Sequence, residues 1–345
     1  MTRAASIVAL AVVLAGPAGA AEKKLVYYGW DVRDTAWVAA HWQEMERQPF
    51  DGVAVSVAVD RVAWARGRTD TTNQLGWNVF GARAFGPDDV ALALADLRRP
   101  RWTRFTENFL PVCPSADAEL RGFAWDDDAR WRVVLGNWRT VVGLARAAGL
   151  RGILLDPEGY GARLFATGAP ELVRRRGREL MAAAQEVYPD LTVLTLEAYS
   201  LALRDPQDYA RYPAFLDGML EAAGPGTRVV DGFEVGAGYR TPAEFAAGRR
   251  DVRERGQALS AVPELYRRSV AVGFGLWLDH GGPARWSADA PERNYFTPAA
   301  LETALREALA ASDRYVWLYS QAPRPFAGGG LPDAYRAAIV AARGG

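Results

Sequence analysis

Segments typical of buried β-strands alternate with segments typical of α-helices along the whole chain of 345 residues. Such alternation favours a parallel sheet whose strands are joined by helical crossovers. A helix that begins at Thr35 with Asp34 as its N-cap is one example. The strand candidates are 25–31, 53–57, 105–112, 152–156, 191–197, 228–234, 270–279 and 315–320. Eight units of this kind predict an α/β fold, a single (β/α)8 TIM barrel.

A doubly wound open sheet is the alternative architecture. No Gly-x-Gly-x-x-Gly sequence follows the first strand candidate, so the chain offers no support for a dinucleotide-binding version of that fold. The chain also lacks an obvious linker or low-complexity tract that would divide it. We therefore expect one barrel catalytic domain over residues 21–345.

Residues 1–20 have the features of a secretory signal peptide. Arg3 precedes the apolar run 4–14, and Ala18-Gly19-Ala20 supplies the small residues of a cleavage site. No later segment approaches the roughly 18 uninterrupted apolar residues of a membrane span. The sequence therefore predicts a secreted or periplasmic monomer with no membrane insertion after signal cleavage.

The composition removes several classes of chemistry. Basic and acidic residues balance at 41 each, which does not indicate a nucleic-acid partner. Lysine occurs only at positions 23 and 24, so Schiff-base chemistry inside the fold has no candidate. His41 and His280 are too few for imidazole-rich metal sites, and Cys113 has no partner for a disulfide. No cofactor or metal is implied, and carboxylates remain for proton transfer.

The segment Gly152 to Gly161 places two acids at the end of an apolar run. Asp156 and Glu158 are two residues apart and would share one face of an extended strand. The structural alternative is a strand stopped by Pro157, with Asp156 capping a turn. The recurrence of acids at other strand ends favours a functional interpretation.

The other strand candidates also carry polar and aromatic residues near their ends. In a barrel the carboxyl ends of the strands converge on one mouth, where active sites lie. On strand seven, small residues lie below Trp277 and would leave room at that mouth. The polar candidates are Asp31, Glu107, Asn108, Asp156, Glu158, Glu197, Glu234, Asp279, His280 and Gln321. The aromatic candidates are Trp30, Tyr160, Tyr199, Tyr239, Trp277 and Trp317.

Carboxylates surrounded by aromatic rings are typical of sugar recognition. Aromatic rings stack on the flat apolar faces of sugars, while acids bind hydroxyl groups and move protons. Hydrolysis of a glycosidic bond uses two carboxyl groups, one protonated and one ionised. Crowding several acids raises the pKa of one of them and so supplies the proton donor.

The mature chain resembles secreted (β/α)8 glycoside hydrolases. Asp156-Pro157-Glu158 is similar to the end of the Asp-x-Asp-x-Asp-x-Glu signature of family 18 chitinases, with Gly152 and Leu154 in place of the upstream acids. The strand ends also resemble the α-amylase superfamily at Asp156, Glu197 and Asp279-His280, with Leu154 in place of an arginine. The resemblance implies the superfamily, in which the acid/base often follows strand four.

The main hypothesis is a secreted glycoside hydrolase that cleaves a poly- or oligosaccharide. Glu158 would donate the proton, Asp156 would orient it, Glu234 or Asp279 would be nucleophile or base, and Glu197 could take either role. The remaining candidates would bind the carbohydrate. A non-catalytic carbohydrate-binding barrel is the alternative, because Gln321 stands where an acid might be expected. A metal-assisted hydrolase using Asp156, Glu158, Asp279 and His280 is the third.

Overall fold

The structure is a computed structural model that describes residues 22–29, 31, 33–114, 123–160, 163–327 and 330–344. The expected signal peptide and Trp30 therefore lie outside the described residues. Nine parallel-paired strands form the centre of the molecule. They are β1 (Lys24–Tyr27), β2 (Gly52–Val53), β3 (Phe109–Val112), β4 (Gly152–Leu155), β5 (Thr192–Thr195), β6 (Arg228–Asp231), β7 (Val270–Val272), β8 (Phe274–Trp277) and β9 (Tyr315–Tyr319).

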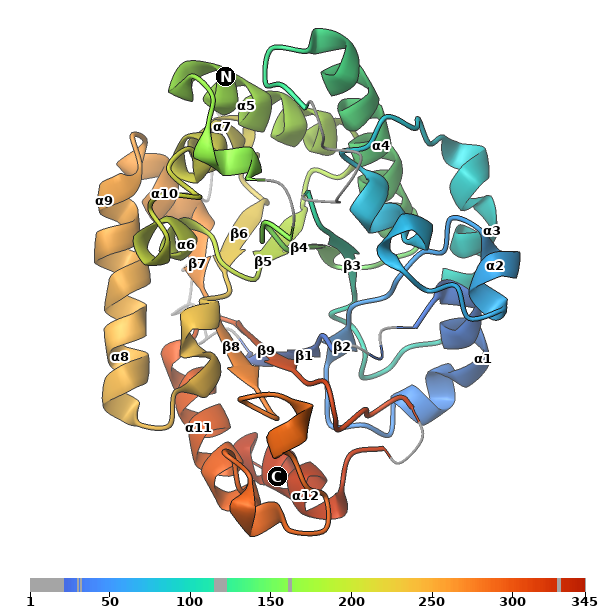
Figure 1. Ribbon diagram of the computed structural model, residues 1–345, viewed down its shortest axis with the longest axis vertical. Helices are drawn as coiled ribbons and strands as arrows, with labels where there is room; N and C mark the ends of the chain where they lie inside the picture. Colours follow the sequence, from blue (N-terminus) through green and yellow to red (C-terminus); the bar gives the residue numbers. More distant parts are fainter. Residues whose placement is uncertain are drawn as a thin grey trace, which may run out of the picture.

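The strands are arranged in a ring (Figure 1). One sheet has the order β2-β1-β9-β8 and the other β3-β4-β5-β6-β7. β7 continues into β8 through Gly273, where a Cβ atom would lie only 2.9 Å from the Val230 side chain. On the opposite side, Ala54 and Phe109 form a parallel bridge between the segments of β2 and β3. The two sheets thus join at both edges, and the seventh predicted strand is present but divided at Gly273.

Helices surround the ring on its outer side (Figure 1). Asp34 caps the first of them as predicted, because its side chain accepts a hydrogen bond from the N–H of Trp37. No described helix is both long and apolar enough to cross a membrane. The helices are α1 (Thr35–Met45), α2 (Arg61–Ala65), α3 (Pro87–Leu97), α4 (Asp128–Ala147), α5 (Pro170–Val187), α6 (Tyr199–Arg204), α7 (Tyr212–Ala222), α8 (Pro242–Arg250), α9 (Gln257–Leu259), α10 (Pro263–Ser269), α11 (Pro298–Ala311) and α12 (Asp333–Ala342).

Alternate residues of each strand face the interior of the ring, as the two-residue period of a strand requires. The large tryptophan Trp317 lies directly over Gly275, where a Cβ atom would come within 2.4 Å of its ring. The space that the glycines of strand seven leave is therefore filled by Trp317 and is not open at the mouth, contrary to the prediction. The interior cluster consists of Val26, Ala54, Phe109, Leu154, Leu194, Leu196, Val230, Tyr315 and Trp317.

Candidate active site

Four acids gather at the carboxyl end of the strands. Asp156 and Glu158 follow β4, Glu197 follows β5, and Glu234 begins the 3₁₀-helix η5 (Glu234–Gly238) after β6. Burial, and in addition the charge of Glu158, raises the pKa of each of the other three, so all three lie within electrostatic range of Glu158. These four residues were all predicted from the sequence, and the structure brings them together.

The turn after β4 joins both of its acids to one tyrosine. Asp156 is almost fully buried and accepts hydrogen bonds from the N–H of Glu158 (3.1 Å) and the hydroxyl of Tyr160 (3.0 Å). The same hydroxyl lies 2.6 Å from Oε2 of Glu158. Burial, and then the charge of Glu158, raises the pKa of Asp156 to about 7. Asp156 therefore caps the turn, as the structural alternative proposed, and also belongs to the acidic group.

Glu197 is the acid that has a cationic partner. Its Oε2 accepts hydrogen bonds from Nε (3.0 Å) and Nη2 of Arg204 in α6. Its other oxygen, Oε1, is buried and has no hydrogen-bond partner among the described residues. Burial outweighs the arginine and raises the pKa of Glu197 to about 7. Nη2 of Arg204 also lies 4.0 Å from Oε1 of Glu158, so one guanidinium group serves two carboxylates.

Glu234 is the acid of this group whose burial is least balanced by hydrogen bonds or nearby cations. Its Oε2 is buried and accepts no hydrogen bond from the described part of the chain. Burial, followed by the charges of Glu158, Glu197 and Asp156, raises the pKa of Glu234 from 4.5 to about 8. Glu234 follows Phe233, which has a φ of 40° and is the one described residue other than glycine with positive φ. A backbone conformation this unfavourable is found mainly at functional positions.

Aromatic side chains that the prediction did not include lie beside these acids. Tyr28 continues the inward-facing alternation of Val26 just beyond β1, and its ring lies 6.4 Å from that of Tyr319. Burial, and then the charge of Asp156, raises the pKa of Tyr28 well above its usual range. Trp77, in the insertion after β2, lies 5.1 Å from the ring of Tyr160. The alternation of β1 was the signal that could have identified Tyr28.

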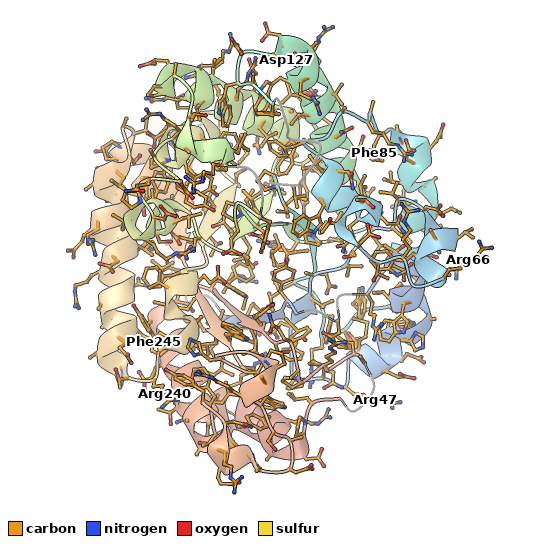
Figure 2. All side chains as sticks on the ribbon, in the orientation of Figure 1. Arg47, Arg66, Phe85, Asp127, Arg240 and Phe245 are labelled. Carbon is orange, nitrogen blue, oxygen red and sulfur yellow. The ribbon has the colours of Figure 1, made fainter. Side chains whose placement is uncertain are left out.

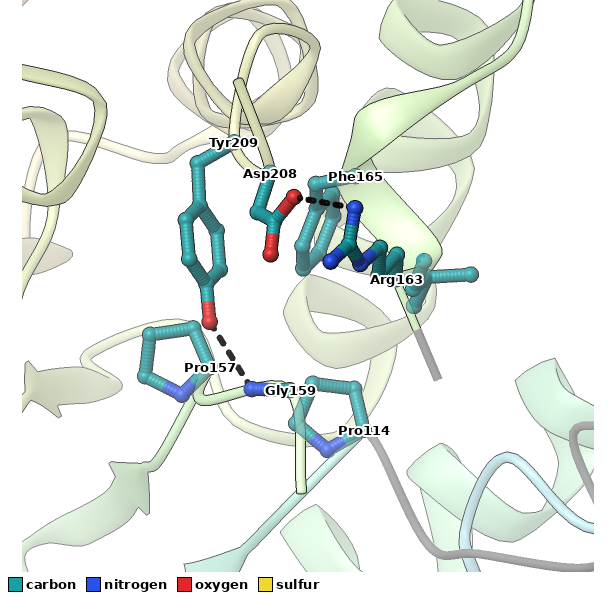
Figure 3. A pocket seen from close by; sticks show the side chains of 8 residues that line it. Pro114, Pro157, Gly159, Arg163, Phe165, Asp208 and Tyr209 are labelled. Carbon is teal, nitrogen blue, oxygen red and sulfur yellow. Dashed lines mark hydrogen bonds and ion pairs between the residues drawn. The ribbon is translucent and has the colours of Figure 1, made fainter. Parts of the chain in front are cut away.

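A small hollow lies behind the turn after β4 (Figure 3). The hydroxyl of Tyr209 accepts a hydrogen bond of 2.8 Å from the N–H of Gly159, which fixes the turn that carries Glu158. Arg163 and Asp208 form an ion pair of 3.2 Å across the hollow. The lining residues are Pro114, Pro157, Gly159, Arg163, Leu164, Phe165, Asp208 and Tyr209.

Glu107 and Asn108 do not lie at the mouth, and their predicted placement is wrong. β3 begins at Phe109, so both residues precede the strand and lie at the opposite, amino end. Glu107 forms an ion pair of 2.7 Å with Arg314 and accepts a hydrogen bond from the hydroxyl of Tyr315. The prediction failed because the apolar run from Phe105 does not show where hydrogen bonding of the strand begins.

Three of the predicted aromatic residues are packing residues. Tyr199 is buried in α6 and donates a 2.8 Å hydrogen bond to Asp217 of α7, which contradicts its predicted role in the site. Trp317 is buried inside the ring and donates to the carbonyl oxygen of Gly232 (2.9 Å), so it too is not a sugar-binding surface. Tyr239 is half-buried and packs against the rings of Phe233 and Phe245.

Asp31 and Asp279 fix the loop that follows β9. Asp31 accepts hydrogen bonds from the hydroxyl of Tyr27 (2.5 Å) and the N–H of Phe326 (2.8 Å). Asp279 accepts from Nε1 of Trp277 (2.9 Å) and from the N–H groups of Gln321 (3.0 Å) and Ala322 (2.9 Å). These contacts use the oxygens that the predicted base would need.

The last two polar candidates lie near that loop. The side-chain amide of Gln321 donates to the hydroxyl of Tyr319 (2.9 Å), and the ring of His280 lies 4.4 Å from that of Tyr295. Among the described residues, no three His, Cys, Asp or Glu side chains form a group that could hold a metal ion.

Comparison with known proteins supports the fold. No model of a protein family and no curated protein matches the chain. Among solved structures, the exo-β-1,4-mannosidase Op5Man5 from Opitutaceae bacterium strain TAV5 is similar, with a TM-score of 0.52 and 15% identity over 93% of this chain. This chain spans 59% of the length of that mannosidase chain.

Two further solved structures have lower similarity. A family GH18 chitinase from Chromobacterium violaceum has a TM-score of 0.49 and 13% identity, covering 94% of this chain and 84% of that one. A GH5_18 protein from Streptomyces cattleya in complex with GlcNAc has a TM-score of 0.47 and 15% identity, covering 94% and 80%. The likeness to Op5Man5, together with the ring of parallel strands, confirms the predicted barrel fold.

Proposed function

We propose that the protein is a glycoside hydrolase that cleaves a poly- or oligosaccharide with Glu158 and Glu234 as its carboxyl pair. The observation that carries the proposal is the group of four acids at the carboxyl end of the barrel, of which only Glu158 and Glu197 pair with a cation, Arg204, among the described residues. Burying acids without cations is costly, and such an arrangement is typical of catalytic sites. Export after removal of residues 1–20 is part of this proposal.

The contacts favour Glu234 as the proton donor. Its buried Oε2 has no hydrogen-bond partner among the residues that the structure describes, and its pKa is raised to about 8, so the neutral form prevails at pH 7. Glu158 accepts a hydrogen bond from Tyr160, has Arg204 4.0 Å away and is about one-third exposed, so it is accessible and held in place to act as the second carboxyl group. These roles are the reverse of the expectation from the sequence, in which Glu158 was the donor.

The reaction follows from these two roles. Glu234 transfers its proton to the glycosidic oxygen as the bond between that oxygen and the anomeric carbon breaks. Glu158 then either attacks the anomeric carbon or removes a proton from the water that does so. Tyr160 and Asp156 hold Glu158 in place, and Arg204 holds Glu197 through its guanidinium group.

Product analysis on a panel of neutral and charged polysaccharides tests this proposal. We expect the wild-type protein to release new reducing ends and Glu158→Gln to do so 10²–10⁴-fold more slowly. Glu186→Gln, which alters an exposed acid of α5, is the matched control and should keep full turnover. Full activity of Glu158→Gln would contradict the assignment.

The same screen separates the alternatives. Saturable glycan binding without any product, unchanged in Glu158→Gln, would instead identify a non-catalytic carbohydrate-binding barrel. Loss of activity after thorough chelation would favour the metal-assisted alternative, whereas activity that survives chelation would remove it.

A further inference from the structure

Three exposed arginines and one histidine form a basic rim beside the acidic group. Arg240 follows η5, His280 and Arg285 follow β8, and Arg324 follows β9, so all four lie on loops at the carboxyl end of the strands. Figure 2 labels Arg240 near the lower left of the barrel. None of the three arginines forms an ion pair with an acid in the described ranges. The basic rim therefore carries positive charge that is offset only in part, at Arg240, by the nearby carboxylate of Glu244.

Ring stacking holds one half of the basic rim. The guanidinium carbon of Arg240 lies 3.5 Å from the ring centroid of Tyr295, whose other neighbour is His280 at 4.4 Å. Burial, and then the charges of Arg240 and Arg285, lowers the pKa of His280. The carboxylate of Glu244 is occupied by the N–H groups of Arg240 and Thr241 and by the Thr241 hydroxyl. The guanidinium group of Arg240 is thus held in place by the ring of Tyr295 and by its hydrogen bond to the carbonyl oxygen of that residue.

A hollow between the loops after β8 and β9 forms the other half. Pro283, Gln321, Ala322 and Arg324 line it. Asp279 holds the N–H groups of Gln321 and Ala322, so the loop that carries Arg324 is fixed on the barrel. Nε of Arg324 donates to the carbonyl oxygen of Gln321 (3.0 Å). This contact directs the guanidinium group while it uses only one of its donors.

A row of aromatic rings joins the acidic group to the basic rim. Tyr28, whose pKa is raised by Asp156, lies 6.4 Å from Tyr319, centroid to centroid. Tyr319 lies 5.8 Å from Trp277, and Trp277 lies 5.4 Å from His280. These rings are tilted or edge-on to one another, at 51–65°, and each is partly exposed, so together they form a partly apolar path along which sugar rings can contact single rings.

We propose that the basic rim binds an anionic group, a carboxylate or a sulfate ester, on a sugar of the glycan that lies along this aromatic row. Guanidinium groups recognise both anions through paired, charge-assisted hydrogen bonds. The acidic group would repel an anion at the cleavage site itself, so the charged sugar is held at a distance from it. This inference rests on the proposed function, because it takes the ligand to be a glycan.

Calorimetric binding to Glu158→Gln protein tests the inference without turnover. The probes are tetrasaccharides with one backbone in neutral, uronate-bearing and sulfate-ester forms. We expect at least one charged form to bind tenfold or more tightly than the neutral form, and this advantage to shrink as salt is added. The tighter of the two charged forms identifies the natural anion. Equal affinity for all three forms would overturn the inference.

Substitution of arginines in the basic rim is the second test of the inference. Arg285→Gln with Arg324→Gln should remove most of the advantage of the charged form and leave binding of the neutral form unchanged. Arg306→Gln, an exposed arginine of α11, is the matched control and should change neither. A charged-form advantage that survives both rim substitutions would contradict the assignment.

The two proposals fail in different ways. Cleavage of neutral glycans without any preference for charged ones would refute the basic rim and leave the hydrolase intact. Preferential binding of charged glycans that the wild-type protein never cleaves would refute the hydrolase and support the basic rim.

Discussion

The two ends of the barrel use the same acidic residues in opposite ways. At the amino end, buried acids face arginines that neutralise them. Glu107 lies between Arg151 and Arg314. Each of these three residues lies one or two positions before the start of a strand. The other pairs at that end are Asp51 with Arg343, and Asp313 with Arg249 and Arg253.

At the carboxyl end, only Glu158 and Glu197 of the four acids pair with a cation, Arg204, and two buried oxygens of the group have no hydrogen-bond partner in the described ranges. Burial disfavours the charged form of these acids, so the pKa rises to about 7 for Asp156 and Glu197 and to about 8 for Glu234. These acids therefore keep their protons to a higher pH than usual. Acids at the amino ends of the strands thus form ion pairs that stabilise the fold, whereas acids at the carboxyl ends have raised pKa values suited to proton transfer.

Glu234→Gln should give the largest effect and would test the reactive end. Turnover on glycans with sugar leaving groups should fall 10²–10⁴-fold, because the proton donor is lost. An aryl glycoside with an acidic phenol needs no proton, so its turnover should fall less than about tenfold. Initial rates on the two substrates measure this difference. Equal losses on both would remove Glu234 as the donor, and Glu158→Gln should lose both.

Glu107→Gln tests the stabilising end. Arg314 and Tyr315 would lose a charged acceptor, so the free energy of unfolding should fall by about 2 kcal/mol. Chemical denaturation measures that change. The turnover of the folded protein should stay within about twofold of wild type, because Glu107 is at the far end from the site. A loss of turnover without a loss of stability would contradict the claim that acids at the amino end stabilise the fold and take no part in the site.

The pH dependence of stability sharpens the contrast. The pKa of Glu234 is about 8 in the folded protein and near 4.5 when unfolded, so the folded state holds an extra proton between those values. Wild-type stability from this group is therefore lost as the pH rises from 4.5 to 8. Glu234→Gln does not titrate and should gain on wild type over that window, by on the order of 2 kcal/mol after screening. Thermal unfolding of both proteins at several pH values measures the gain, and parallel curves would contradict it.

Asp279→Asn should give the smallest effect. Asp279 fixes the loop after β9 through two backbone N–H groups and also accepts from the indole of Trp277, and an amide oxygen can still accept from some of these donors. We expect kcat to fall less than about tenfold, with most of the change in KM. Steady-state kinetics distinguish this result from the loss of 10²-fold or more that a catalytic base would give.

The alternation of apolar segments was enough to predict the barrel and the meeting of Asp156, Glu158, Glu197 and Glu234. Strand direction alone fixes which end of a strand a residue occupies, so these positions followed once the strands were assigned. Glu107 was misplaced because the start of its strand is set by pairing with β4, which the local sequence does not show.

Side-chain partners were the second limit. Whether Asp279 is free or bound to the loop after β9 depends on residues about forty positions away. In the same way, Tyr199 was misassigned because a helix begins at that residue and buries it against α7. Tyr28 was missed because its role comes from the pleat of β1 and not from a motif.

The most direct test of the account is a titration of the glutamate side-chain carboxyl groups by carbon-13 NMR, in wild type and in Glu234→Gln. We predict a wild-type carboxyl resonance that titrates near pH 8 and disappears in the variant, as the pKa of Glu234 requires. If every glutamate carboxyl titrates below about pH 5, in the ordinary range of the residue, Glu234 is not protonated at neutral pH. That result would contradict the claim that a protonated acid is held at the carboxyl end of the barrel.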